Sequence, residues 1–127
     1  MSIFDHVSIH VSDFDRSDAF YRAALSSLGI AQKFSMPRPD GHVAGFGRER
    51  SSFFIASGQP AHAAIHLALS AGSRAEVDAF HLAALAAGGR DNGAPGVRPR
   101  YHANYYAAFV FDPDGNNVEA VFQGEPG

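Results

Sequence analysis

The chain has no cysteine and no tryptophan, only one lysine and no long apolar run. Without cysteine there is no disulfide framework, no thiolate metal site and no cysteine nucleophile, and a reducing compartment is compatible with the composition. No apolar stretch approaches the roughly 20 residues that a membrane-spanning helix needs, and the first residues enter a strand pattern directly instead of a charged and then apolar leader. We therefore expect a soluble cytoplasmic protein with no membrane partner.

The charge pattern argues against nucleic acid as a partner. The net charge is -3, the arginines are scattered, and Lys33 is the single lysine. A nucleic-acid-binding domain carries a concentrated basic face, which this sequence lacks. The chain does contain seven histidines among 127 residues, and histidine serves both as a metal ligand and as a general base.

An internal repeat indicates how the chain is divided. A shift of 60 residues places His6 on His66, Phe20 on Phe80 and Gly29 on Gly89. Such a repeat predicts two copies of one unit, neither of which buries its sheet face alone. We predict a single α+β domain over residues 1–127, made of two βαβββ modules at about 1–58 and 62–127.

The same element order is expected in both halves. Helices are predicted from Ser12 or Asp13 to about Leu28, and from Ser73 to Gly88, where the spacing to Glu76 is typical of a capping box. A long loop rich in glycine and proline is predicted at 89–104. Strands are predicted at 3–11, 31–35, 42–47, 52–57, 62–71 and in a hairpin at 109–122.

Three of these strands carry polar side chains on one face. Because side chains alternate along a strand, the strands at 3–11 and 62–71 place branched apolar residues on one face and histidines on the other. In the hairpin, the same period places Glu119 opposite its apolar neighbours. Two related sheets that face a common axis would bring His6 and His66 together. The alternative is that this face is open to water and Glu119 is a solvated surface group.

The hairpin turn predicts which tyrosine approaches Glu119. Asp112 to Gly115 has the residue types of a tight turn. If this turn pairs Phe111 with Asn116, then Tyr106 faces the cavity beside Glu119, and we assign Tyr106 as a catalytic phenol. An aromatic ring that fills the core is the alternative.

The loop at 89–104 offers further candidates, because loops held between rigid elements often carry substrate contacts. From this loop we assign His102 as a catalytic residue, and Arg98 and Tyr101 as substrate-binding residues.

The first strand adds Ser8 and His10, which share the face of His6 and are assigned to substrate binding. His62 occupies the corresponding face of the fifth strand. A place on an ordinary polar rim is the alternative for His10 and His62.

Three segments of the sequence resemble the vicinal oxygen chelate superfamily of glyoxalases, bleomycin resistance proteins and extradiol dioxygenases. They are DHVSIHVSDFDRSDAFY near the N-terminus, IHLALS before the second helix and DPDGNNVEAVF at the end. The resemblance covers essentially the whole chain and implies a curved mixed sheet around a metal cavity, with helices outside, in a homodimer. It makes His6, His66 and Glu119 the metal ligands, since a glutamate at this distance from a DPDG turn binds the metal in that superfamily.

This ligand set has open coordination positions that suit a divalent ion, with Fe, Mn, Zn, Ni and Co as candidates. The superfamily's fourth acid is missing from the strand at 52–57, where Ile55 is its nearest equivalent, and this counts against a glyoxalase I reaction. We expect one metal ion per site. The enzyme is expected to be a dioxygenase, a lyase or an isomerase that acts on a small oxygen-chelating substrate. The alternative is a non-enzymatic bleomycin-type drug-binding protein, which the complete ligand set disfavours.

Overall fold

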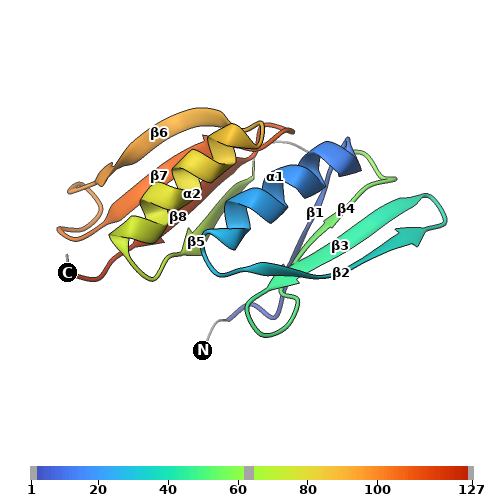
Figure 1. Cartoon of the computed structure of the whole chain (residues 1–127), viewed down its shortest axis with the longest axis horizontal. Coiled ribbons are helices and arrows are strands. Elements are labelled where there is room, and N and C mark those ends of the chain that lie inside the picture. Colours follow the sequence, from blue (N-terminus) through green and yellow to red (C-terminus); the bar gives the residue numbers. More distant parts are fainter. Residues whose placement is uncertain (1–2, 62–64, 126–127) are drawn as a thin grey trace.

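The computed structural model describes residues 3–61 and 65–125, in which two helices and eight strands are found (Figure 1). The first module contains β1 (Val7–His10), α1 (Phe14–Ser26), β2 (Ala31–Arg38), β3 (Gly41–Gly47) and β4 (Phe53–Ala56). The second contains β5 (His66–Ser70), α2 (Arg74–Ala86), β6 (Arg90–Val97), β7 (Tyr106–Phe111) and β8 (Asn117–Phe122). The predicted α+β fold with two βαβββ modules is confirmed.

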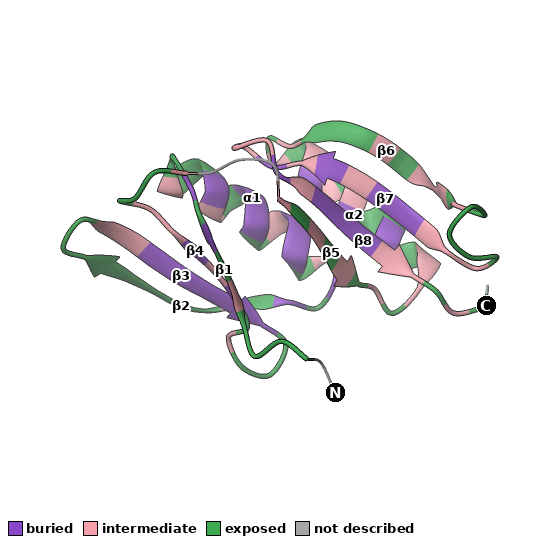
Figure 2. Ribbon diagram, turned by 180° about the vertical axis from the view of Figure 1, so that it is seen from behind, coloured by how far each residue is buried: buried purple, intermediate pink, exposed green. Residues whose placement is uncertain are grey.

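Each module forms one four-stranded sheet, and the two strand orders correspond. Sheet A has the order β1-β4-β3-β2 and sheet B the order β5-β8-β7-β6. The pairs β1–β4 and β5–β8 are parallel, whereas the pairs joined by hairpins are antiparallel. Both helices cover the same side of the sheets, and the other side is open (Figures 1 and 2). Neither helix of the described segments is long and apolar enough to cross a membrane.

The predicted alternation of side chains is present and decides which residues reach the open side. On β1, Ile9 is buried under the helices, whereas Ser8 and His10 are exposed. The buried strand positions and the helices form one hydrophobic cluster that joins both modules (Figure 2). The helix residues in this cluster include Phe20, Tyr21, Leu25, Val77 and Phe80.

Both helices begin at the predicted residues. The N-cap of α1 is Asp13, whose carboxylate accepts from the Arg16 N–H at 3.2 Å. The N-cap of α2 is Ser73, whose hydroxyl accepts from the Glu76 N–H at 3.1 Å. Glu76 in turn accepts from the Gly72 N–H at 2.9 Å, one residue before the cap. These contacts satisfy N–H groups that have no partner within the helix, and so fix where each helix starts.

The turn between β7 and β8 corrects the predicted strand register. The Asp112 N–H donates to the Asn116 carbonyl at 2.9 Å, which leaves a three-residue loop with Gly115 in the left-handed region at φ 88°. Such loops hold one residue more than a two-residue turn. Phe111 therefore pairs with Asn117, and the predicted pairing with Asn116 is wrong.

This register turns Tyr106 away from the open side of sheet B. The hydroxyl of Tyr106 donates to Oδ1 of Asp78 on α2 at 2.6 Å, and this hydrogen bond raises the pKa of Tyr106. The predicted position of Tyr106 beside Glu119 is therefore wrong. A shift of one residue moves every side chain of a strand to the other face.

The predicted loop at 89–104 is wrong over its first half, where β6 is formed. The register between β6 and β7 shifts at Gly93 and again before Gly96. Gly93 has a φ of 155°, and Pro95 lies on the edge strand, where its missing N–H removes no ladder hydrogen bond. These irregularities disturb the alternation by which a strand is recognised in a sequence.

Hydrogen bonds fasten α1 to the turn of the other module. Tyr21 donates to Oδ2 of Asp112 at 2.6 Å, and both side chains are buried. The Asp112 carboxylate also accepts from the backbone N–H groups of Asp114 and Asn116. Ser12 donates to the carboxylate of Asp114. Burial raises the pKa of Tyr21, and the nearby Asp112 charge adds to the effect.

Replacing Tyr21 by Phe is expected to lower the free energy of unfolding by about 1–3 kcal/mol at neutral pH, because Asp112 loses a buried donor. The pKa of Tyr21 is raised in the folded protein, so its contribution is complete below the ordinary value of 10.0 and is lost as pH rises through the folded value. Urea denaturation should therefore show a difference between the two proteins that shrinks above about pH 10.

The exposed Tyr101 supplies the control, since Tyr101→Phe should change stability by no more than about 0.5 kcal/mol. A difference between wild type and Tyr21→Phe that stays constant up to about pH 11 would contradict the raised pKa of Tyr21.

Candidate functional site

A carboxylate and an imidazole meet on the open side of sheet B. Glu119 lies within β8, opposite Ala68 of β5 and Phe109 of β7. Its side chain is only 1% exposed, and its Oε1 is 2.7 Å from Nε2 of His66 at the beginning of β5. The His66 side chain is 54% exposed. The structure thus brings two of the three predicted ligands together, one of them buried and the other accessible.

Tyr105 completes the contacts of this carboxylate. Its hydroxyl donates to Oε2 of Glu119. Burial together with this hydrogen bond raises the pKa of Tyr105 to about 12, so the phenol remains a donor at neutral pH. Tyr105 is not among the residues predicted from the sequence, because a two-residue turn places Tyr106 and not Tyr105 beside Glu119. The signal that could have identified it was Gly115, the residue that lengthens the loop and shifts the register.

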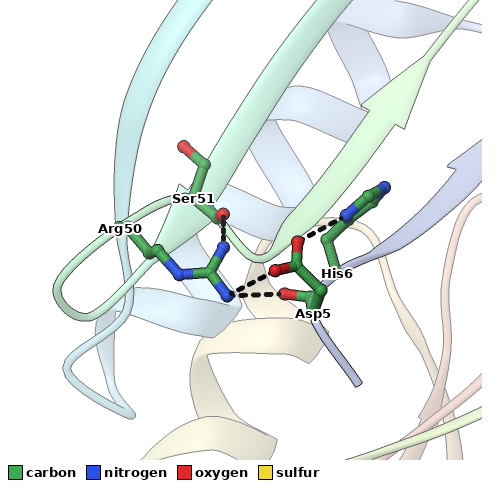
Figure 3. A network of polar contacts seen from close by, with 4 residues as sticks. All are labelled: Asp5, His6, Arg50 and Ser51. Atoms are coloured by element: carbon green, nitrogen blue, oxygen red, sulfur yellow. Dashed lines mark hydrogen bonds and ion pairs between the residues drawn. The ribbon is translucent and has the colours of Figure 1, made fainter.

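The third predicted ligand, His6, lies just before β1 in a separate network (Figure 3). Its Nδ1 is 2.9 Å from Oδ1 of Asp5, and its ring meets Phe54 edge-on with centroids 5.5 Å apart. Arg50 donates to the carbonyl and to the carboxylate of Asp5. The hydrogen bond with His6, and then the charge of Arg50, lower the pKa of Asp5. This arrangement holds the His6 ring through one nitrogen and leaves Nε2 for another partner.

Within one chain, His6 does not join the other two predicted ligands. Both views show β5 running in the opposite direction to β1 (Figures 1 and 2). Across residues 3–61 and 65–125, no group of three His, Cys, Asp or Glu side chains is placed to hold a metal ion. The predicted ligand set is therefore divided between two modules of the same chain.

The other predicted site residues are dispersed. Ser8 and His10 are exposed on β1, and Ser8 borders, together with His6 and His66, a cavity of about 850 Å³ between the two modules. His102 lies in the turn before β7, where its Nδ1 accepts from the Asn104 N–H at 3.0 Å, and it borders neither described pocket. His62 lies outside the described residues.

The position equivalent to a fourth acid also differs from the prediction. Ile55 is fully buried in the hydrophobic cluster on the helix side of β4. Its neighbour Phe54 reaches the open side instead and contacts the rings of His6 and Phe34. β4 therefore presents an aromatic ring next to His6, and none of its residues is a carboxylate.

A pocket of about 510 Å³ adjoins His66 on the open side of sheet B. Two residues that the sequence analysis assigned to substrate binding, Arg98 and Tyr101, border it. It is also lined by residues that the sequence did not predict, namely Arg100, Asn92, Phe109 and Asn117. The pocket and the Glu119–His66 pair together form the candidate functional site.

Comparisons with known proteins agree with the fold and the sequence motifs. The model of the Glyoxalase/Bleomycin resistance protein/Dioxygenase superfamily matches residues 3–120. The chain belongs to this superfamily. The resemblance expected from the three sequence segments is thereby confirmed. No curated protein matches the chain.

Solved structures of superfamily members are similar over nearly the whole chain. A glyoxalase/bleomycin resistance protein from Albidiferax ferrireducens T118 has a TM-score of 0.76 and 30% identity, and the match covers 97% of this chain and 100% of the other. A glyoxalase I mutant from Zea mays has a TM-score of 0.71 and 25% identity, over 93% of this chain and 45% of that one. A family enzyme from Burkholderia phytofirmans PsJN, with a TM-score of 0.70 and 19% identity over 94% of this chain and 98% of its own, shows the fold alone.

The residues present fit a divalent metal ion of the kind associated with this superfamily. Glu119 is a buried carboxylate whose partners are an imidazole and a phenol, with no Arg or Lys among its described contacts. A buried charge needs a compensating charge, and Glu119 and His66 would hold a cation that supplies it. Tyr105 holds the second oxygen of Glu119, as an outer partner does for a metal-binding carboxylate.

Proposed function

We propose that this protein is a divalent-metal-dependent enzyme that binds a small substrate through two neighbouring oxygen atoms. The observation that carries the proposal is the buried Glu119 carboxylate, which meets His66 beside an open pocket. Glu119, His66 and one His6 would hold the metal. When bound, the metal would stabilise the negative charge that develops on the two substrate oxygens.

We further propose that two copies of the chain complete each site. His6 of the same chain borders the same cavity as His66 but forms no metal-ligating group with His66 and Glu119, so the His6 that joins them would come from a second copy. A twofold dimer makes this exchange reciprocal, because each copy gives its His6 and receives the other's. Each chain offers one open sheet side with His6 and another with the Glu119–His66 pair. The homodimer therefore has two equivalent sites.

The residues of the chain position the ligands and the substrate. Tyr105 donates to Oε2 of Glu119 and so directs Oε1 toward His66. Asp5 has the same effect on His6, since its contact with Nδ1 leaves Nε2 for coordination. The lack of cysteine ligands and disulfides agrees with an enzyme of the cytoplasm.

The proposal predicts that the purified protein binds about one divalent metal ion per chain. Compounds with two adjacent oxygens, such as catechol, should bind to the metal-loaded protein and not to the metal-free protein, because the metal supplies their attachment point. Metal analysis and calorimetric titration in both states measure this. Equal binding of catechol with and without metal would reject the metal-dependent function.

The reaction class can be decided with the same protein. Oxygen consumption by Fe(II)-loaded protein with a catechol selects a dioxygenase, whereas turnover under nitrogen with another metal selects a lyase, isomerase or transferase.

A second candidate function is drug binding without catalysis, as in bleomycin resistance proteins. The row of aromatic rings from Phe34 through Phe54 to His6 on sheet A favours it, because planar ligands stack on such surfaces. Tight binding of an aromatic drug to metal-free protein, with no turnover by any metal form, would select this function.

A further inference from the structure

The pocket beside His66 has an unusual charge. Two guanidinium groups, those of Arg98 and Arg100, border it, and none of its described lining residues is Asp or Glu. The described arginine ion pairs are made by Arg22 and Arg50, so Arg98 and Arg100 have no carboxylate partner within the described segments. Glu119, whose two oxygens already contact His66 and Tyr105, is 1% exposed. The pocket is therefore positively charged.

The backbone of β6 is shaped to hold Arg98 at this position. Nη2 of Arg98 donates to the Ala94 carbonyl at 2.7 Å, and the Arg98 guanidinium lies 5.4 Å from the centre of the Phe109 ring. A Cβ atom added at Gly93 or Gly96 would come within 3.3 or 3.0 Å of the Arg98 guanidinium nitrogens. The two glycines of the irregular strand thus leave the space that the guanidinium occupies.

Arg100 is held by the neighbouring aromatic residues. Its Nη2 donates to the Tyr101 hydroxyl at 2.6 Å, and its guanidinium lies 4.7 Å from the centre of that ring. The Tyr101 ring in turn lies 5.0 Å from Tyr105, which donates to Glu119. A row of contacts therefore connects the cationic end of the pocket to the Glu119–His66 pair.

We propose that the substrate carries an oxyanion group, a carboxylate or a phosphate, which Arg98 and Arg100 bind. Guanidinium groups bind both oxyanions through paired, charge-assisted hydrogen bonds. A volume of about 510 Å³ suits a small molecule that reaches from the arginines to His66. The inference rests on the proposed function for the position of the chelating oxygens, whereas the oxyanion contact requires no metal.

The test compares probes that differ in one anionic group. In metal-loaded protein, 3,4-dihydroxybenzoate should bind about 10-fold or more tightly than catechol, because its carboxylate reaches the arginines. Arg98→Gln and Arg100→Gln should each remove most of this advantage while metal content stays unchanged. Arg90→Gln is the matched control, since Arg90 lies on β6 and stacks on Phe111 at 5.1 Å but does not border the pocket.

Benzoate and phenyl phosphate test the oxyanion contact in metal-free protein. The probe that binds more tightly shows whether the arginines prefer a carboxylate or a phosphate. Their binding should weaken in Arg98→Gln and Arg100→Gln, weaken with added salt, and persist in Arg90→Gln. Arg-dependent binding of these probes would support the inference even if metal had no effect on catechol, an outcome that rejects only the proposed metal function. Equal affinities for catechol and 3,4-dihydroxybenzoate, with no binding of either metal-free probe, would overturn the inference.

Discussion

Replacing Glu119 by Gln is expected to lower metal affinity by more than about 100-fold, beyond the usual effect of losing an outer partner of a ligand. Gln keeps the shape of the side chain but removes the charge that a buried cation needs. Because a metal at about 100 times its Kd stabilises the folded protein by about 2.7 kcal/mol, added metal should raise the Tm of the wild type and not that of Glu119→Gln. Metal analysis after dialysis and thermal melting with and without metal measure the two effects.

The exposed Glu125 provides a control with the same chemical change. Glu125→Gln should bind metal like the wild type, since this side chain is exposed near the end of the chain. Metal content in Glu119→Gln equal to that in Glu125→Gln would place the site elsewhere. In metal-free buffer Glu119→Gln should keep the fold, because the Gln amide can accept from Tyr105 as the carboxylate does.

The sequence predicted those features that depend on a regular period. Alternation along β1 and β5 identified which face carries the histidines, and the 60-residue repeat identified the two modules. Burial enforces this alternation, because a strand turned by one position would expose its apolar side chains. The Glu119–His66 contact follows from the same rule, since His66 pairs with Asn117, two residues before Glu119 in the parallel neighbour β8.

The errors occur where glycine and proline change the backbone. Gly115 lengthens the loop by one residue. As a result Tyr105, and not the predicted Tyr106, contacts Glu119. Gly93 and Pro95 concealed β6, whose irregular register holds Arg98 over the open side of sheet B. A left-handed glycine or an edge-strand bulge leaves no periodic signal in the sequence.

The periodicity of the sequence could not predict that His6 stays apart from the Glu119–His66 pair. Alternation states which face a side chain takes, but not how two sheets are oriented relative to each other. In this chain α1 and α2 pack in one cluster, and α1 is fastened to the β7–β8 turn through Tyr21. In the resulting orientation β1 and β5 run in opposite directions, and the described residues form no group of three metal-ligating side chains (Figures 1 and 2).

The proposed exchange of His6 between two copies can be tested with chains that each lack one ligand. His6→Ala and Glu119→Gln should each bind little metal alone. When the two chains are mixed and allowed to reassociate, about half of the dimers contain one of each, and each mixed dimer has one site with all three ligands intact. Metal content should therefore return to about a quarter of the wild-type level.

A mixture of His66→Ala with Glu119→Gln separates this exchange from a general effect of mixing. Both lesions lie in the second module, so every site of the mixed dimer lacks a ligand and no metal should return. If each chain instead built its site from its own two modules, neither mixture would recover metal, because every chain carries a defect. Recovery in the first mixture and not in the second requires that His6 reach the Glu119–His66 pair from the other copy.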